Sequence, residues 1–195
     1  EKECFVGRQE YLKSMEEQFA GKEGPVVLYG IAGIGKTALA REYIRRHQSD
    51  YDKVLFLSYH TSLQELICDD SQLSFSNLRF SRKKYENKNR YFKEKIKLLC
   101  REAERNRLLL VIDDCSMKGD PKLEMLLDVP CDFLFTTRMD PQIWGDYRGI
   151  YVKELETEGE WSAFRKAYQK GKSPTGQKKA FFDFCSRMKG HTLLM

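Results

Sequence analysis

The segment Gly30-Ile31-Ala32-Gly33-Ile34-Gly35-Lys36-Thr37 has the residue types and spacing of a phosphate-binding loop, G-x-x-x-x-G-K-[ST]. Glycines allow the backbone to wrap closely around phosphate oxygens and to direct its N–H groups at them. The lysine supplies a mobile positive charge for the outer phosphates, and the threonine hydroxyl can ligate Mg²⁺. The loop therefore predicts binding of ATP or ADP with Mg²⁺, with Lys36 also taking part in catalysis. The residues predicted to surround the phosphates are Gly30, Gly33, Ile34, Gly35, Lys36, Thr37 and Ala38.

Two aspartates follow the most apolar segment of the chain, Leu108 to Ile112. Asp113 is predicted to hold the Mg²⁺ together with Thr37, directly or through water, and Asp114 to orient or deprotonate the attacking water. Taken alone, the pair is equally typical of a polar strand end that caps a helix. Beside a phosphate loop, the catalytic interpretation is favoured.

Thr136-Thr137-Arg138 ends another apolar segment, Phe133 to Phe135. An arginine at this place can reach a γ-phosphate and report whether it is present, which gives Arg138 a predicted catalytic role. The alternative is an ion pair between Arg138 and a surface carboxylate.

Alternating elements are expected to position these residues. Apolar runs at 25–29, 54–58, 108–112, 133–135 and 151–155 predict five strands, and apolar residues at helical spacing predict helices at 8–19, 36–47, 92–103 and 123–127. Near-continuous apolar strands that alternate with helices indicate a parallel sheet covered on both faces. Beyond residue 156 only helices are expected, so the chain is divided into a nucleotide-binding domain (1–156) and part of a helical subdomain (157–195).

The composition favours a cytoplasmic protein with reduced thiols. Six cysteines are scattered among 195 residues without a CxxC pair, and no apolar run approaches the roughly 20 residues of a membrane span. The net charge of +5 is concentrated between Arg79 and Lys97, where nine Lys/Arg and two Asp/Glu give +7 and leave −2 elsewhere. Nucleic-acid binding is possible there but not indicated, because a solvated excursion at the sheet edge explains the charge better.

The ordered motifs resemble the STAND class of P-loop ATPases and, within it, the NB-ARC type. The resemblance rests on Phe5 to Glu10, Gly30 to Thr37, Leu109 to Asp114, Phe135 to Arg138 and Leu155 to Phe164, and more weakly on Gly190 to Leu194. Thr192 stands where the family's late Gly-Leu-Pro-Leu motif has proline. Asp114 stands where related motor ATPases have glutamate, and the shorter acid favours a slow switch.

The resemblance implies a three-layer P-loop NTPase fold with strand order 5-1-4-3-2, in which the arginine strand separates the Asp113 strand from the phosphate-loop strand. It implies that Val6 and Arg8 contact the adenine end of the nucleotide. It also implies a switch that rests with ADP, exchanges it for ATP and then self-associates, while weak ATP hydrolysis resets it. Because the chain starts at Glu1 and stops in an apolar run, sensor and effector domains are expected outside it.

Two other functions share these motifs. An actively cycling AAA+-like ATPase that acts on DNA or protein uses the same core. A small-molecule kinase is favoured less, since such enzymes usually place the second aspartate strand next to the phosphate loop.

Overall fold

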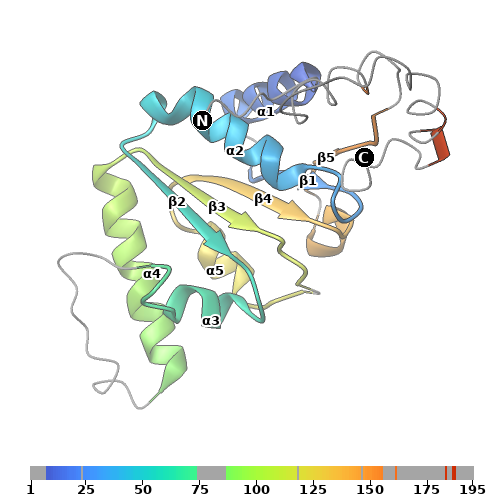
Figure 1. Cartoon of the computed structure of the whole chain (residues 1–195). Coiled ribbons are helices and arrows are strands. Elements are labelled where there is room, and N and C mark those ends of the chain that lie inside the picture. Colours follow the sequence, from blue (N-terminus) through green and yellow to red (C-terminus); the bar gives the residue numbers. More distant parts are fainter. Residues whose placement is uncertain are drawn as a thin grey trace.

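The computed structural model describes residues 8–22, 24–73, 87–117, 119–145 and 147–155, together with residues 161, 183, 186 and 187. Helices and strands alternate through these ranges (Figure 1). The elements are α1 (Gln9–Gly21), β1 (Val26–Tyr29), α2 (Lys36–His47), η1 (Gln48–Asp50), β2 (Lys53–Ser58), α3 (Leu63–Cys68), α4 (Lys88–Arg105), β3 (Leu108–Asp113), α5 (Leu123–Leu127), β4 (Asp132–Thr137), η3 (Pro141–Trp144) and β5 (Gly149–Tyr151). In the described part of the chain, no helix combines the length and apolar character needed to cross a membrane.

The five strands form one parallel sheet in the order β2-β3-β4-β1-β5, which confirms the predicted order. Leu28 of β1 lies opposite Thr136 of β4 and Ile150 of β5. On the other side of β4, Phe135 lies opposite Ile112 of β3. Since all strands run in the same direction, the residues that follow β1, β3 and β4 meet at one edge of the sheet, which we call the carboxyl edge.

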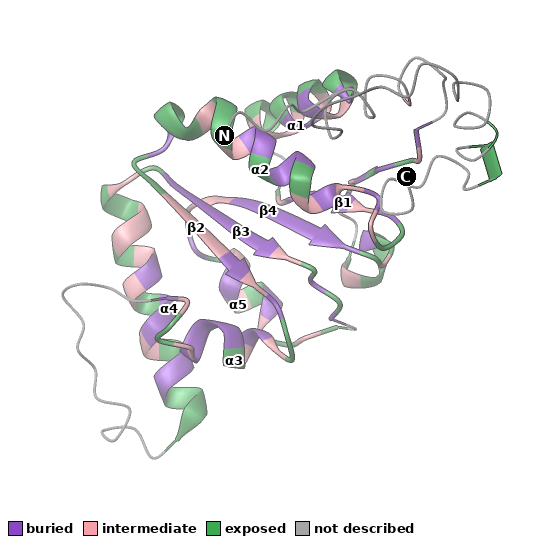
Figure 2. Ribbon diagram, in the orientation of Figure 1, coloured by how far each residue is buried: buried purple, intermediate pink, exposed green. Residues whose placement is uncertain are grey.

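Helices cover both faces of the sheet, as near-continuous apolar strands require (Figure 1). Val26 and Leu28 of β1 pack with α1 and α2 on one face, whereas Val27 packs with the α3, α4 and α5 side. The same alternation holds along β3 and β4, so the central strands are buried on both faces (Figure 2). The result is the predicted three-layer α/β arrangement.

The helix after the phosphate loop forms because its apolar residues recur on one side. Leu39, Ala40 and Tyr43 are buried against the sheet, at the spacing that places them on one helical stripe. The helix begins directly after Gly35, whose φ of 101° lies in the left-handed region that glycine adopts most readily. α2 therefore runs from the carboxyl edge of the sheet, where Lys36 starts it, toward the opposite edge.

The segment after β2 differs from the prediction, which left 61–88 without regular structure. Residues Leu63 to Cys68 form α3, in which Leu63, Leu66 and Ile67 are buried. Ser62 caps its first turn, because the Ser62 hydroxyl accepts a hydrogen bond from the Glu65 N–H at 3.2 Å. One turn and a half of helix is too short for a periodicity argument, so the surrounding polar residues hid it.

The described part of the basic segment 79–97 is helical and packs on the core. From Lys88 onward it belongs to α4, and its aromatic residues Tyr91 and Phe92 are buried in the core. Lys95 is also buried, and its ammonium group donates to the Leu73 carbonyl at 2.8 Å. These residues hold α4 against α3 and the turn that follows α3, which is a structural role.

The fifth strand lies earlier than predicted, at Gly149–Tyr151 instead of 151–155. Val152 extends the pairing, since its N–H donates to the Tyr29 carbonyl at 2.8 Å. Three other expectations, Val6, the helical subdomain at 157–195 and the Thr192 motif, fall almost wholly outside the described residues.

Candidate nucleotide-binding site

The phosphate loop connects β1 to α2 at the carboxyl edge. The Lys36 side chain is only 7% exposed and folds back over the loop, where its ammonium group donates to the carbonyls of Gly30 at 2.8 Å and Ile31 at 2.7 Å. These bonds hold the loop as a closed turn around its own lysine. The first N–H groups of α2 have no partner within the helix, so the turn has the donors and positive dipole end that favour an anion.

Gly30 occupies a position where only glycine fits. Its φ is 147°, and a β-carbon added there would lie 2.7 Å from the Val152 carbonyl oxygen. The close approach joins the start of the phosphate loop to the segment after β5. A side chain at residue 30 would push these two backbones apart and open the loop.

The other predicted loop residues serve different purposes. The Ile34 side chain is fully buried in the core between the sheet and α1 and α2, so its contribution to a ligand is limited to its backbone. Gly33 has a left-handed φ of 72°, and Ala38 is exposed in the first turn of α2. The structure thus brings Gly30 to Ala38 into one loop, and their contacts with nucleotide stay predictions.

Asp113 meets two hydroxyl groups at the end of β3. Its Oδ1 accepts hydrogen bonds from Thr37 of α2 at 2.7 Å and from Thr136 of β4 at 2.6 Å. Thr37 and Asp113 lie 76 positions apart in sequence, so the fold alone assembles the pair. A hydroxyl and a carboxylate in contact are the hard oxygen donors that Mg²⁺ takes together with substrate phosphates.

The donor set therefore fits the predicted Mg²⁺. Among the described residues, no three His, Cys, Asp or Glu side chains cluster as a protein-only metal site. A nucleotide-linked Mg²⁺ needs no such cluster, because it keeps several waters and takes other ligands from phosphates. Thr37 and Asp113 would hold the ion, and its charge would offset that of the phosphates.

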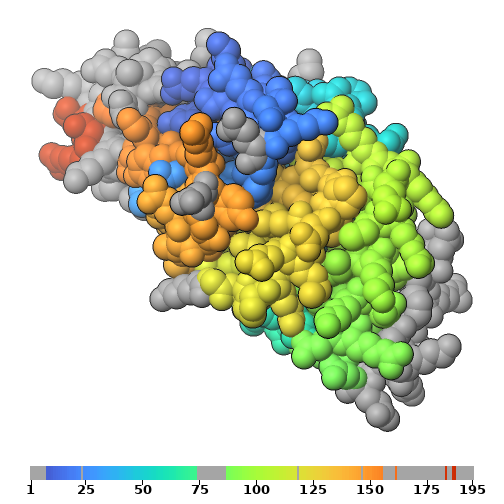
Figure 3. All heavy atoms as spheres, turned by 180° about the vertical axis from the view of Figure 1, so that it is seen from behind, coloured from blue at the N-terminus to red at the C-terminus, as the bar shows by residue number. Residues whose placement is uncertain are grey.

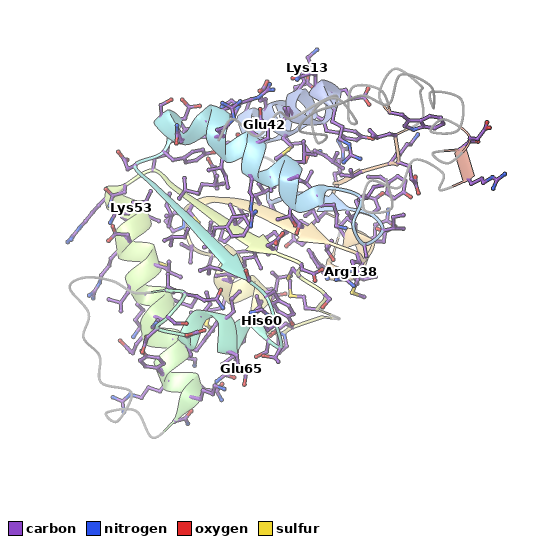
Figure 4. The ribbon with its side chains drawn as sticks, viewed as in Figure 1. Lys13, Glu42, Lys53, His60, Glu65 and Arg138 are labelled. Carbon is purple, nitrogen blue, oxygen red and sulfur yellow. The ribbon has the colours of Figure 1, made fainter. Side chains whose placement is uncertain are left out.

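Asp114 and Arg138 form an ion pair at the same edge. The Arg138 Nε and Nη2 donate to the two carboxylate oxygens of Asp114 at 3.0 and 2.8 Å. The Asp114 side chain is 50% exposed and the Arg138 side chain is 56% exposed. Figure 4 shows Arg138 beyond the end of β4, while Lys53 lies at the far end of the sheet. The predicted catalytic acid and the predicted γ-phosphate reporter are thus partners of each other.

Thr136 is the residue whose importance sequence analysis did not identify. Its buried hydroxyl donates to Asp113 and also accepts from the Asp114 N–H at 2.9 Å. Asp114 has a left-handed φ of 54°, which ends β3, and the next N–H, that of Cys115, donates to the Thr136 carbonyl at 2.7 Å. One threonine on β4 therefore fixes the positions of both acids. The only sequence signal was that a hydroxyl residue comes two positions before Arg138.

The electrostatic environment of Lys36 connects these groups. Burial lowers its pKa below the usual value, the carboxylate of Asp114 raises it, Arg138 lowers it and Asp113 raises it. Each of the three side chains is thus close enough to act on Lys36. Two cations and two carboxylates thus lie near one another, and their formal charges sum to zero.

Arg8 lies at the start of α1, close to the segment after β5. Its Nη2 donates to the Lys153 carbonyl at 3.3 Å, and the Lys153 N–H donates to the Tyr11 hydroxyl at 3.2 Å. Arg8 is buried and has a left-handed φ of 62°. Since the neighbouring residue Val152 lies against Gly30, Arg8 is linked to the phosphate loop through the segment 152–153. The predicted contact between Arg8 and adenine stays a prediction.

A cavity of about 850 Å³ lies at the opposite, amino edge of the sheet. It is bordered by the ends of α1, α4 and α5 and by the starts of β1, β3 and β4. Figure 3 shows the face on which α1 (blue), the α5–β4 region (yellow) and α4 (green) meet. None of the residues predicted to bind nucleotide or metal borders this cavity.

Comparison with known proteins identifies the kind of site. A family model described as an ATPase domain predominantly from Archaea matches residues 5–128, which is more than half of the chain. That range contains the phosphate loop, Asp113 and Asp114. No curated protein sequence matches significantly.

Two solved structures share the fold. A Signal Transduction ATPase with Numerous Domains (STAND) protein with a tetratricopeptide repeat sensor, from Pyrococcus horikoshii, is 22% identical with a TM-score of 0.58. A Walker-type ATPase from Pyrococcus abyssi is 15% identical with a TM-score of 0.61. Each comparison covers 98% of this chain, but only 29% and 65% of the respective relatives. Together with the family match, they support the resemblance to STAND-class P-loop ATPases, whereas the NB-ARC type is not distinguished.

Proposed function

The chain belongs to a family of ATPase domains predominantly from Archaea, and we propose that it is the ATP- and ADP-binding switch module of a larger STAND-class regulator of the NB-ARC type. Residues 1–156 are the nucleotide-binding domain in this proposal, and 157–195 belong to a helical subdomain. The neighbour from Pyrococcus horikoshii combines its ATPase with a tetratricopeptide repeat sensor. By analogy, the sensor and effector of this protein lie outside its 195 residues.

The position of Arg138 is the observation that carries the proposal. Arg138 follows β4, the strand between the phosphate-loop strand and the Asp113 strand, and its guanidinium is half exposed at the carboxyl edge. A cation at this place can contact a γ-phosphate, which ATP has and ADP lacks. The site therefore has a group whose partner depends on the nucleotide, which a switch requires.

The remaining residues account for slow hydrolysis. Lys36 and the loop N–H groups bind the phosphates, Thr37 and Asp113 hold the Mg²⁺, and Asp114 orients the attacking water. Asp114 is already held by Arg138, so it is not continuously available as a base. Weak hydrolysis then returns the module to its ADP state, and the conformational change or self-association of the full-length protein follows the nucleotide.

Purification and turnover measurements test this function. We expect the intact protein to release ADP on denaturation, as measured by ion-exchange chromatography of the supernatant. We expect only a few ATP molecules hydrolysed per hour, with no stimulation by DNA or by unfolded protein. Brisk hydrolysis that rises on adding either one would establish the cycling AAA+-like ATPase instead. Transfer of the γ-phosphate to a small-molecule acceptor would establish a kinase.

A further inference from the structure

We propose that Asp114 sets how strongly the site distinguishes ATP from ADP, because its carboxylate competes with the γ-phosphate for the guanidinium of Arg138. The inference rests on the proposed function, in which Arg138 contacts that phosphate. It gives Asp114 a second role, in which the residue lowers the affinity for ATP before any hydrolysis takes place.

The geometry of the pair makes the two partners mutually exclusive. Arg138 uses its Nε and Nη2 together, at 3.0 and 2.8 Å, to bind both oxygens of Asp114. Arginine binds phosphate oxygens with the same planar fork of donors. A γ-phosphate that takes this edge of the guanidinium must therefore displace the Asp114 carboxylate.

Asp114 is anchored, whereas the Arg138 side chain is free to change its rotamer. The backbone of Asp114 is held in its left-handed conformation by the Thr136 hydroxyl, and the following Cys115 N–H is held by the Thr136 carbonyl. Arg138 reaches Asp114 through a long side chain that is 56% exposed. When the pair separates, the backbone of Asp114 stays in place and the long side chain of Arg138 moves.

The strength of the pair suits an exchange of partners. Half-exposed ion pairs contribute little free energy, and breaking one changes an equilibrium constant by about 1.4- to 5-fold. ATP therefore displaces Asp114 at a small cost in affinity, while ADP leaves the pair intact. Displacement also releases the Asp114 carboxylate toward the attacking water, so the acid becomes available only when ATP is bound.

A double-mutant cycle tests the competition. Asp114→Asn, Arg138→Gln and the double variant are prepared in the intact protein and stripped of nucleotide. Asparagine tolerates the left-handed backbone of residue 114, so the fold is retained. Calorimetric titration with Mg²⁺ and either ADP or the non-hydrolysable analogue AMP-PNP gives the two affinities.

We expect Asp114→Asn to raise the AMP-PNP affinity about 1.4- to 5-fold and to leave the ADP affinity unchanged. In the Arg138→Gln background the same substitution should have no effect, because no guanidinium remains to be released. Asp140→Asn is the matched control. Asp140 is an exposed acid two residues after Arg138, its carboxylate accepts from the Gln142 N–H at 3.0 Å, and asparagine preserves that cap. It should change neither affinity.

Two results would overturn the inference. An equal gain in both backgrounds would mean that Asp114 simply repels the γ-phosphate, and no gain in either would mean that it does not compete at all. The proposed function fails separately: it requires Arg138→Gln alone to lower the ratio of AMP-PNP to ADP affinity by about tenfold or more. If that ratio falls but the effects of the two substitutions simply add in the double variant, only the proposed competition is wrong.

Discussion

The carboxyl and amino edges of the sheet both collect polar side chains, but they arrange them differently. At the amino edge, around the 850 Å³ cavity, Arg107 contacts residues of the neighbouring strands. The guanidinium of Arg107 lies 5.0 Å from the centre of the Tyr51 ring and 4.0 Å from Asp132, and the backbone N–H of Arg107 donates to the Asp52 carboxylate at 2.7 Å. These contacts join the start of β3 to the starts of β2 and β4.

At the carboxyl edge the contacts bring reactive groups from separate elements to one place. Thr37, Asp113 and Thr136 meet within 2.7 Å although they come from α2, β3 and β4. Four residues of this edge, Gly30, Gly33, Gly35 and Asp114, have left-handed φ values. The comparison shows that convergence of donors and acceptors, and not the volume of a cavity, distinguishes the candidate site.

Removing the loop lysine should have the largest effect. Lys36→Ala deletes the charge that faces the phosphates and both bonds that close the loop. Since hydrogen bonds to a charged group contribute about 1.5–3 kcal/mol each, we expect nucleotide affinity to fall by a factor of 100 or more, roughly 3 kcal/mol. Calorimetric titration with ADP measures this.

Lys53→Ala is the matched control from the amino edge, where Lys53 pairs with Glu102 at the surface. It removes the same charge and should leave ADP affinity unchanged. Equal losses in the two variants would show that binding depends on overall charge and not on the loop.

Acid should destabilise the protein through α2, the helix that connects the two edges. A hydrogen bond from Arg45, and a second from Arg46, lower the pKa of the buried Glu42 from 4.5 to about 2, although burial acts in the opposite direction. Because the pKa is lower in the folded state, the stabilisation is complete above pH 4.5 and is lost as the pH falls toward 2.

We expect this stabilisation to be about 2 kcal/mol, reduced by the exposure of Arg45. Urea unfolding of the wild type and of Glu42→Gln at about pH 6 and about pH 3 measures it. The excess free energy of unfolding of the wild type over the variant should shrink by more than half between the two pH values. A constant excess would place the pKa of Glu42 near its ordinary value. ADP affinity at neutral pH should be the same in both proteins.

The hydroxyl of Thr136 should matter for Mg²⁺ binding as well as for folding. Thr136→Val leaves the Asp114 N–H and Asp113 without their shared partner, which costs about 1–3 kcal/mol for a buried group. We expect the gain in ATP affinity that Mg²⁺ provides to fall by about tenfold, and Thr136→Ser to restore it.

Thr137→Val controls for the loss of a buried hydroxyl on the same strand. Its oxygen accepts a hydrogen bond from the Met139 N–H at 3.1 Å. This variant should lose stability without losing the Mg²⁺ effect. A similar Mg²⁺ defect in both variants would make the role of Thr136 purely structural.

The smallest effect is expected at the amino edge. Asp132→Asn weakens a contact with Arg107 at 4.0 Å, in which the arginine is 63% exposed. The free energy of unfolding should change by no more than about 0.5 kcal/mol, and nucleotide affinity should not change. Thermal unfolding and ADP titration measure the two quantities. A marked loss of nucleotide affinity would place a ligand in the amino-edge cavity.

Local patterns predicted most of the fold. The strand order followed from the motifs and the family they resemble, and α2 and α4 from apolar residues repeated over several turns. The failures have local causes. The helix α3 is too short to show periodicity. In α4, the surrounding charged residues hid the fact that Lys95 and Tyr91 are buried. The prediction placed β5 too late in the chain, because Val152 still pairs with Tyr29 beyond the end of the strand.

The candidate site was predictable as a set of residues but not as a set of contacts. The phosphate loop and Asp113 were predicted from short motifs, and their binding of nucleotide and Mg²⁺ stays a prediction. The pairing of Asp114 with Arg138 spans 24 positions and depends on the left-handed backbone of Asp114, which no sequence pattern revealed. The role of Thr136 depends likewise on the register between β3 and β4.

Hydrogen exchange measured by mass spectrometry tests most directly whether the carboxyl edge is the nucleotide site and Arg138 its γ-phosphate contact. On adding Mg²⁺ and nucleotide to the stripped protein, we expect slower exchange in peptides covering 28–40 and 111–116 with ADP as well as with AMP-PNP. The segment 134–140 should be protected further by AMP-PNP alone. Protection confined to 103–108 and 127–133, at the amino edge, or an identical pattern for the two nucleotides, would contradict this account.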